Sequence, residues 1–222
     1  MIIVIEGIDG AGKSTLVQAL VDAAAQSDLL VKRHAYPRYS SAPMGSLFTK
    51  GLRGDVGDLL DSIYGMAALF ALDRHADRDF LHQAAADKNT VYILDRYVAS
   101  NAAYSMGRIA ARDGHTDLQP SADMLQVSQF IADFEFGECG LPVPDLSIFL
   151  DTPVEVSRAR AKAREEAAGH NPDRYEANAV LQEQTAASYR YLAQQQWMGQ
   201  WIHINGEEPQ AIASKIMRQL KA

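Results

Sequence analysis

The sequence predicts an α/β fold in which a parallel β-sheet is covered by helices on both faces. Five apolar runs of strand length recur along the chain, and segments with helical periodicity separate them. The first run, residues 1–6 (MIIVIE), is continuous and rich in β-branched residues, which is typical of a strand buried on both faces. Strands that alternate with helices pair in parallel through right-handed crossovers, so their carboxyl ends lie along one edge of the sheet.

The five strands are expected at residues 1–6, 29–37, 90–95, 147–151 and 201–204. Helices are expected at residues 13–26, 58–86, 121–136, 153–168, 174–196 and 209–222. The segment 13–26 shows the helical pattern clearly, because Leu16, Val17, Leu20 and Val21 fall on one helix face. Sheets of this kind bind ligands at the carboxyl ends of their strands, so functional residues are expected in the loops that follow the strands.

Composition and charge argue against several classes of function. The formal net charge of −7 disfavours a nucleic-acid-binding surface, which needs a basic excess. The single cysteine, Cys139, rules out an internal disulfide and fits a reducing compartment. The apolar run at residues 1–5 is too short for a signal or membrane segment. We therefore expect a cytoplasmic protein with neither nucleic acid nor a membrane as a partner.

Residues 7–14 (GIDGAGKS) fit the phosphate-binding pattern G-x-x-x-x-G-K-[ST] between a predicted strand and a predicted helix. Glycines let backbone N–H groups turn toward phosphates, and the helix N-terminus adds a positive dipole end. Lys13 is expected to reach the β- and γ-phosphates and Ser14 to offer its hydroxyl to Mg²⁺. A glycine turn with an incidental lysine is the alternative, and the strand–loop–helix context disfavours it. We expect ATP to be held by Gly7, Ile8, Asp9, Gly10, Ala11, Gly12, Lys13, Ser14 and Thr15.

Two further groups of charged residues follow strands and suggest phosphoryl transfer. Asp95 and Arg96 end the strand 90–95, where the carboxylate can act through Mg²⁺ or its water and the guanidinium can clamp a phosphate. A surface salt bridge between the two is the alternative. Later, Arg160 and Arg164 share one face of a basic helix, and helix-breaking residues at 169–172 favour a lid at about 158–174. A solvated basic helix is the alternative there. The phosphate loop contains no arginine, so the lid is the expected source of positive charge on the transferring phosphoryl group.

Several segments together resemble the thymidylate kinase family over essentially the whole chain. These are EGIDGAGKST, PRYS, LFALDR, DRYVASNAAYS, the basic lid and DRYE, and they resemble actinobacterial members most closely. The resemblance implies a single P-loop kinase domain over residues 1–222, with five parallel strands and a helical lid. It also implies transfer of the γ-phosphate of ATP to dTMP with Mg²⁺, for dTTP biosynthesis, by a cytoplasmic homodimer.

The resemblance also assigns roles to individual residues. It implies that the catalytic residues are Lys13, Arg96, Arg160, Arg164 and Asp9. It implies that the residues near the metal are Ser14, Asp9, Glu176 and Asp95. It implies that the substrate dTMP is bound by Asp9, Tyr39, Phe70, Arg74, Arg96, Ser100, Asn101, Tyr104, Tyr175 and Glu176. A loop-capping role for the Asp9 carboxylate is the alternative at that position.

Within that set, Tyr39 and Arg96 are expected to hold the dTMP phosphate, with Arg38 as a weaker candidate. Phe70 is expected to stack on thymine, although the residue taken alone would be read as core. Arg74 is expected to donate to O4 of the base, and its chemistry also suits O6 of a purine.

The remaining contacts concern the base edge and the sugar. The resemblance implies that Asn101 reads the base edge and that Ser100 is an additional base contact. Tyr104 is expected near C2′, where its ring would crowd a ribose hydroxyl. Glu176 is expected near the sugar or the metal, and Tyr36 stands where the nearest relatives are expected to carry phenylalanine.

Two other functions are compatible with parts of this pattern. The first is a kinase for another nucleoside monophosphate or for a deoxynucleoside. The second is a P-loop protein that binds or hydrolyses nucleotide without an acceptor. The chain has no Asn-Lys-x-Asp segment, which argues against a guanine-specific switch protein.

Overall fold

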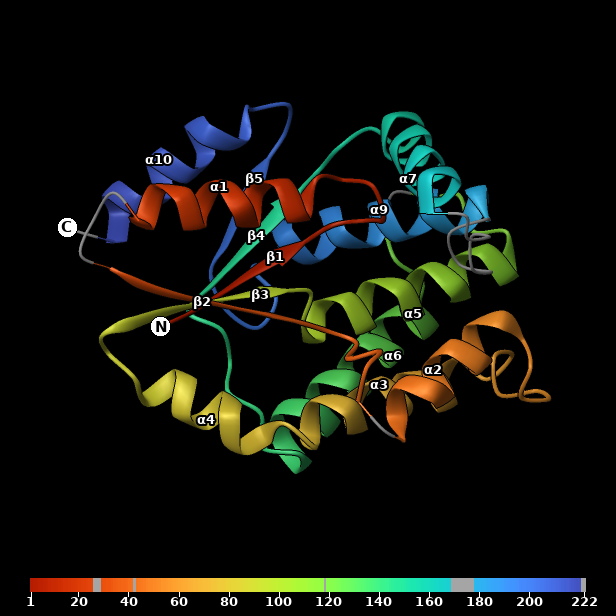
Figure 1. The fold of residues 1–222 in the computed structure, drawn as a ribbon. Coiled ribbons are helices and arrows are strands. Elements are labelled where there is room, and N and C mark those ends of the chain that lie inside the picture. Colours follow the sequence, from red (N-terminus) through yellow and green to blue (C-terminus); the bar gives the residue numbers. More distant parts are fainter. Residues whose placement is uncertain (26–28, 42, 118, 169–177, 221–222) are drawn as a thin grey trace.

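The computed structural model describes residues 1–25, 29–41, 43–117, 119–168 and 178–220 (Figure 1). The described residues form a five-stranded sheet in the order β2-β3-β1-β4-β5, and every neighbouring pair is parallel. The strands are β1 (Ile2–Glu6), β2 (Leu30–Ala35), β3 (Thr90–Asp95), β4 (Leu146–Leu150) and β5 (Trp201–Ile204). The predicted parallel sheet is therefore confirmed, and a strand is found within or near each expected segment.

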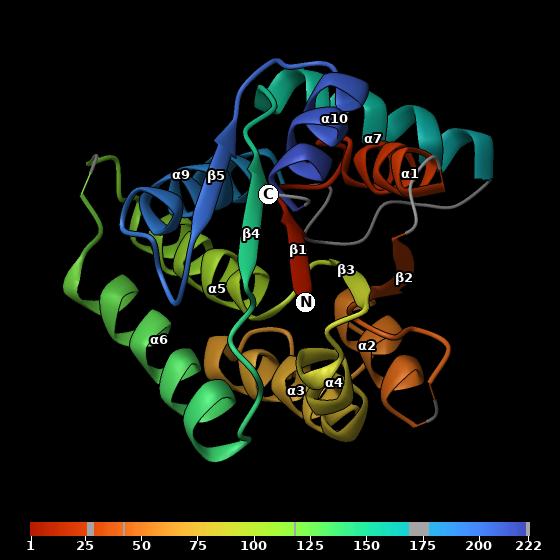
Figure 2. The same cartoon turned by 90° about the vertical axis from the view of Figure 1, so that its left-hand side faces the viewer.

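Helices cover both faces of the sheet (Figures 1 and 2). On one face lie α1 (Lys13–Ala25) and α10 (Pro209–Leu220), which pack against each other. On the other face α5 (Val98–Asp113) packs against α9 (Ala179–Gln194), and outside them lie α3 (Ile63–His75), α4 (Arg78–Ala86) and α6 (Ala122–Ala132). None of the helices in the described ranges is both long and apolar enough to cross a membrane.

Two helices lie beside the edge of the sheet where the strands end. Helix α7 (Val154–Ala168) follows β4 and lies near the start of α1, whereas α2 (Met44–Arg53) lies on the side of α3 and α5 (Figure 1). The core between the layers is built by the central strands, and Ile2, Ile3 and Ile5 of β1 are completely buried. The outer strand β2 is largely exposed and carries Lys32 and Arg33, charges that protect a sheet edge from pairing with another chain.

The structure corrects the expected helices in three places. The stretch 58–86 is not one helix but two, α3 and α4, with a break at Ala76 and Asp77. The stretch 121–136 is α6 followed by η1 (Asp133–Glu138), a π-helical turn. Helices α2 and α5 were not predicted. The apolar residues Met44, Leu47, Phe48 and Leu52 of α2 do have helical spacing, but the helix contains two glycines, which disfavour a helix. Helix α5 is buried on most sides by alanine and small polar residues.

Candidate active site

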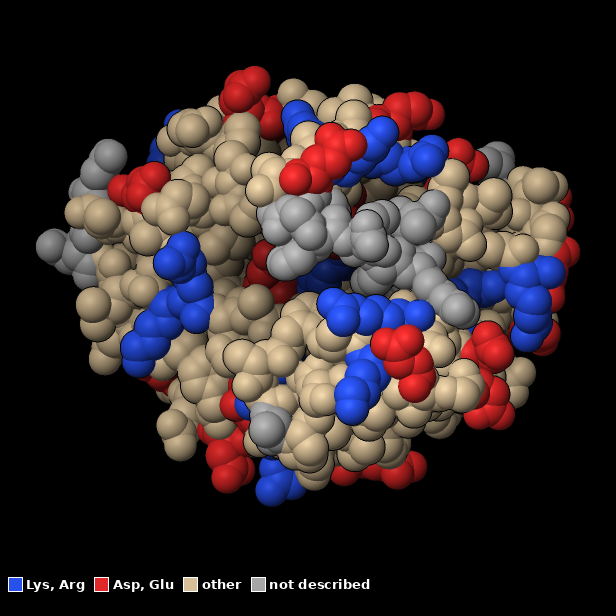
Figure 3. Space-filling view, turned by 45° about the vertical axis from the view of Figure 1, so that its right-hand side comes forward, with Lys and Arg blue, Asp and Glu red and all other residues tan. Residues whose placement is uncertain are grey.

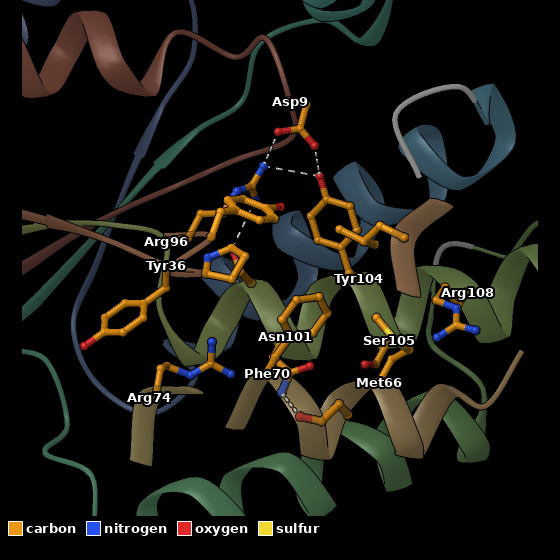
Figure 4. Close-up of a pocket in the computed structure, with 15 residues that line it drawn as sticks. Asp9, Tyr36, Met66, Phe70, Arg74, Arg96, Asn101, Tyr104, Ser105 and Arg108 are labelled. Atoms are coloured by element: carbon orange, nitrogen blue, oxygen red, sulfur yellow. Dashed lines mark hydrogen bonds and ion pairs between the residues drawn. The ribbon is translucent and has the colours of Figure 1, made fainter. Parts of the chain in front are cut away.

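A pocket with an empty volume of about 710 Å³ lies between the phosphate loop and helices α2, α3 and α5, near the carboxyl ends of the strands. Figure 3 shows the molecule turned toward this side, where Lys and Arg side chains gather around a hollow between the two layers. Figure 4 shows residues that line the pocket, with Asp9 and Arg96 at one end and Arg74 and Asn101 at the other. The two ends are built differently.

The loop from Gly7 to Gly12 leaves β1 and leads directly into α1. Gly7, Gly10 and Gly12 have positive φ values of 147°, 80° and 98°, a region that side chains with a Cβ rarely occupy. A Cβ at Gly10 would lie 2.0 Å from the carbonyl oxygen of Ser157, so the loop packs directly on the first turn of α7. The predicted glycine loop between strand and helix is therefore present, and its glycines are required by its geometry.

Lys13 begins α1 and folds back over the loop. Its Nζ donates to the carbonyl oxygens of Gly7, at 3.2 Å, and Ile8, at 3.0 Å. Burial and the neighbouring Arg96 lower the pKa of Lys13 to about 8, although the Asp9 carboxylate acts in the opposite direction. A lysine held in this way carries its charge at neutral pH and is ready to exchange carbonyl partners for phosphate oxygens.

Arg96 is the central cation at the phosphate-loop end of the pocket. Its backbone has a φ of 66°, a left-handed conformation that is strained for an arginine, and strained residues of this kind cluster at functional sites. Its Nη2 donates to Asp9 at 2.7 Å, and the Tyr104 hydroxyl donates to the other Asp9 oxygen at 2.7 Å. Burial alone would raise the pKa of Asp9, but Arg96 and Lys13 outweigh it and hold the pKa well below its usual range. The Asp9 carboxylate therefore has both a cationic and a hydroxyl partner inside the phosphate loop.

A hydrogen-bonded group of three residues, Glu6, Ser100 and Tyr189, lies next to Arg96. Glu6 and Tyr189 were not predicted as site residues from the sequence. Glu6 accepts hydrogen bonds from the Tyr97 N–H at 3.0 Å, the Ser100 hydroxyl at 2.8 Å and the Tyr189 hydroxyl at 2.8 Å. Nη1 of Arg96 donates to the Ser100 and Tyr189 hydroxyls at 3.1 and 3.3 Å. Burial raises the pKa of Glu6 above its ordinary value. The Ser100 hydroxyl, predicted as an additional base contact, is hydrogen-bonded within this group, and Ser100 also lines the pocket.

The other end of the pocket is organised by a buried ion pair. Arg74 donates to Glu135 through Nε, at 2.5 Å, and through Nη2, at 2.6 Å. Although burial lowers the pKa of Arg74, the Glu135 carboxylate raises it, and the net shift is upward. Asn101 donates from Nδ2 to Glu135 at 2.8 Å and to the Ala67 carbonyl at 2.9 Å. The structure therefore brings Arg74 and Asn101 together, through a glutamate that the sequence did not single out.

Aromatic side chains line the pocket between its two ends. Phe70 is half-buried and stacks on Phe48 of α2, with ring centroids 5.2 Å apart, and it also lines the pocket. Tyr39 is exposed at the rim and packs edge-on against Phe48. Arg38, the weaker phosphate candidate, pairs through its guanidinium with Asp73 and Asp77 at 3.0 Å each. Phe48 was missed because α2 itself was not predicted.

The predicted lid and metal residues are only partly within the described residues. Arg160 is exposed on α7, and its Nη1 lies 3.8 Å from the position that a Cβ at Gly12 would take. Arg164 is exposed one helical turn further along α7. Tyr175 and Glu176 lie outside the residues that the structure describes. The structure therefore places at least one lid arginine beside the phosphate loop.

The oxygen atoms near the phosphate loop suit a hard divalent cation. Asp95 ends β3, and its Oδ1 is buried without a hydrogen-bond partner among the described residues. Ser14 lies in the first turn of α1 with an exposed side chain. Mg²⁺ prefers carboxylate, hydroxyl and phosphate oxygens and is usually held by one or two carboxylates together with substrate phosphates. The residues present therefore fit Mg²⁺ bound with a nucleotide.

A phosphate loop that faces an arginine-bearing acceptor pocket across the carboxyl edge of a parallel sheet defines a P-loop nucleotide kinase. The model of the thymidylate kinase family matches residues 5–125. The chain is 38% identical over 218 residues to the thymidylate kinase of Mycobacterium tuberculosis, which covers 97% of both chains. It is 28% identical over 222 residues to the thymidylate kinase of Rhodopseudomonas palustris, covering 99% of this chain and 87% of the other.

A solved structure of thymidylate kinase from Candida albicans superimposes with a TM-score of 0.67 at 22% identity, covering 99% of this chain and 90% of that one, and it shows the same fold. The chain belongs to the thymidylate kinase family. Its reaction is therefore the transfer of the γ-phosphoryl group of ATP to dTMP, with Mg²⁺ as the metal. The predicted family, fold and activity are confirmed.

Proposed function

We propose that dTMP binds in the pocket with its phosphate at Arg96 and its base between Arg74 and Asn101, while ATP occupies the loop from Gly7 to Thr15. The observation that carries this proposal is the polarity of the pocket. One end holds a guanidinium beside the Lys13 loop, and the other holds a guanidinium and an amide beside an aromatic face. A nucleoside monophosphate has the same order of groups, an anion at one end and a planar base with a polar edge at the other.

The proposed chemistry is positioning and charge neutralisation. The acceptor phosphate is already anionic and needs no strong general base, so the chain has to bring two anions together and offset their repulsion. Lys13 would hold the β- and γ-phosphates, and Arg96 would hold the acceptor phosphate. Arg160 and Arg164 would supply positive charge to the equatorial oxygens as the phosphoryl group moves. Closure of the lid at about 158–174 would exclude water.

Mg²⁺ supplies further charge neutralisation on the phosphates when it is bound. We propose that Ser14, Asp9, Asp95 and Glu176 face it or its water shell. Asp9 would also lie near the 3′-hydroxyl of the sugar. Tyr104, held by Asp9, would place its ring near C2′ and so favour deoxyribose over ribose.

We further propose that residues 1–222 act as one domain in a cytoplasmic homodimer. The support for a dimer is an exposed apolar surface on α3 and α6. Tyr64 and Leu72 lie on one face of α3, Leu125 is exposed on α6, and Tyr64 packs edge-on against Phe130. Sedimentation velocity on the wild type and on Leu72→Arg tests this, because a dimer through this surface would dissociate in the variant.

A panel of acceptors tests the proposed site most directly. Steady-state rates with dTMP, dUMP, dCMP, dGMP and thymidine should show dTMP as the preferred acceptor, with ATP consumed in proportion to the product formed. Arg74→Met and Asn101→Ala should raise the KM for dTMP by about tenfold or more while the KM for ATP stays within about twofold. ATP consumption without a phosphorylated acceptor would favour a binding or switch protein, and unchanged dTMP kinetics in both variants would overturn the base site.

A further inference from the structure

Glu135 is a buried carboxylate on the apolar inner side of the turn that follows α6. Within η1 the N–H of Cys139 donates to the Phe134 carbonyl at 2.8 Å, five residues back, which is the hydrogen-bond pattern of a π-helix. Such turns insert one extra residue and occur often at functional sites. Here the turn buries Glu135 completely, whereas Asp133 and Glu138 on the same turn remain exposed.

The hydrogen bonds of Glu135 fix the orientation of two pocket side chains. One carboxylate oxygen accepts from Nη2 of Arg74 and from Nδ2 of Asn101, and the other accepts from Nε of Arg74. The second hydrogen on Nδ2 goes to the Ala67 carbonyl. The reverse orientation of the Asn101 amide would place Oδ1 against two oxygen acceptors, so the network excludes it.

What remains for a ligand is the outer side of the Arg74 guanidinium, with both N–H bonds of Nη1 and the second N–H of Nη2, and one acceptor atom on Asn101. Within the described part of the chain, neither Nη1 of Arg74 nor Oδ1 of Asn101 has a hydrogen-bond partner, and both residues line the pocket (Figure 4). A keto pyrimidine such as thymine presents an acceptor, O4, next to a donor, N3–H. Cytosine presents the reverse, an amino donor next to an acceptor nitrogen. The pair therefore complements thymine and opposes cytosine at both positions.

We infer that Glu135 is a positioning residue that sets the preference for a keto pyrimidine. It acts through Arg74 and Asn101. With the Ala67 carbonyl it occupies both N–H bonds of Asn101, so that Asn101 presents an acceptor to the base, and it fixes the plane of the Arg74 guanidinium, so that Arg74 presents a donor. This inference rests on the proposed function, because it assumes that the base lies between Arg74 and Asn101.

Two variants test the inference by the ratio of kcat/KM for dTMP to kcat/KM for dCMP. Glu135→Gln keeps the shape of the side chain but presents an amide N–H₂ to the guanidinium. The ratio should fall at least about tenfold, mainly through a higher KM for dTMP, while the KM for ATP changes less than about twofold. Glu135→Asp keeps the charge beside Arg74, so folding is expected, and its shorter side chain should lower the ratio about fivefold.

Glu138→Gln is the matched control, because Glu138 lies exposed on the same π-helical turn, and it should keep the wild-type ratio. A merely structural role for Glu135 would lower the yield or the rate for both nucleotides alike, and an unchanged ratio in the folded variants overturns the inference. If Glu135→Gln does not fold, Glu135→Asp decides the question by the same ratio. Failure of the wild type to phosphorylate dTMP would overturn the proposed function instead, so the two failures are distinguishable.

Discussion

The two ends of the pocket each hold a buried arginine paired with a carboxylate, yet the two pairs are built for different tasks. The Arg74 side chain is 3% exposed and Glu135 is 0% exposed, and their ion pair is bidentate. The Arg96 side chain is 13% exposed and Asp9 is 26% exposed, and a single hydrogen bond joins them. Hydroxyl groups of Ser100, Tyr104 and Tyr189 complete the shell of Arg96.

This difference fits the proposal that one end of the pocket recognises the base and the other end holds the reacting phosphate. The Arg74 guanidinium is held by the bidentate pair with Glu135, so at the base edge that we propose for it, it would offer one geometry and reject ligands that do not match it. The Arg96 guanidinium has weaker neutral partners that an incoming phosphate can replace without leaving a buried charge unpaired. The strained backbone at Arg96 also fits a group that serves the reaction rather than the stability of the fold.

The largest expected effect is on activity, at the Arg96 end. Arg96→Met removes the cation that we propose holds the acceptor phosphate, so kcat/KM for dTMP should fall about a thousandfold. Steady-state kinetics measure this. Arg112→Met is the matched control, because Arg112 lies on α5, the helix that follows Arg96, with an exposed side chain, and should change the rate less than about twofold. Retention of more than a tenth of wild-type kcat/KM in Arg96→Met would contradict the assignment.

The next largest effect is on stability, at the Arg74 end. Glu135→Leu leaves the Arg74 charge buried without a partner and should lower the free energy of unfolding by about 3–5 kcal/mol. Asp9→Asn should lower it by only about 1 kcal/mol, because the Asp9–Arg96 pair is more exposed and hydroxyl groups still surround Arg96. Urea unfolding at neutral pH measures both values.

A double variant sharpens this result. Arg74→Met combined with Glu135→Leu removes both charges, and replacing a buried ion pair by apolar side chains of similar volume is often neutral. The double variant should therefore regain most of the stability that Glu135→Leu loses. Equal losses in Glu135→Leu and Asp9→Asn would show that the two pairs do not differ as described.

A smaller effect, the pH dependence of activity, distinguishes Lys13 from Arg96 at the phosphate-loop end. The pKa of Lys13 is lowered to about 8, so in the free enzyme its charge is lost as the pH rises through that value. The pKa of Arg96 is raised well above its usual value, so Arg96 stays charged. From pH 7 to pH 9 the protonated fraction of Lys13 falls about tenfold, and kcat/KM for ATP should fall with it. The Kd of dTMP, measured by calorimetry, should change less than about twofold, and a parallel loss of both would contradict the assignment.

Much of the fold could be predicted because its signals are local in the sequence. Buried parallel strands appear as continuous β-branched runs. The glycines before Lys13 indicate a loop with positive φ values, which the structure has. Helix α5 could not be found in this way, because a helix buried on most sides by small residues has no apolar stripe. Asp77 lies at the break between α3 and α4, and the partners of its carboxylate, Tyr36, Arg38 and His34, lie about forty residues earlier in the chain, so no local pattern reports them.

The candidate site also contains residues that the sequence predicts and residues that it does not. Lys13, Asp9 and Arg96 lie next to strand ends, so topology alone predicts that they meet. Glu135 and Tyr189 support the site from distant segments, and their contacts depend on packing that no local pattern reports. One feature of the sequence does point to Glu135. It is spaced four residues from the apolar residues Ile131 and Cys139, which places a carboxylate on an apolar helix face, and this is rare unless the carboxylate is paired.

The smallest expected effect concerns the pocket wall beside the proposed base position, where Tyr36 stands in place of the expected phenylalanine. Its hydroxyl points away from the base end of the pocket in Figure 4 and donates to Asp77 at 2.9 Å, and Asp77 also pairs with Arg38 and His34. Tyr36→Phe removes one hydrogen bond of this group and should lower the free energy of unfolding by about 1 kcal/mol. The KM for dTMP should change less than about twofold, because the ring that lines the pocket is retained. Urea unfolding and steady-state kinetics on the same preparation measure both. A KM for dTMP raised more than about fivefold would mean that the Tyr36 hydroxyl helps to recognise the base. The loop after β2, which carries Tyr36, would then belong to the fixed base end of the pocket.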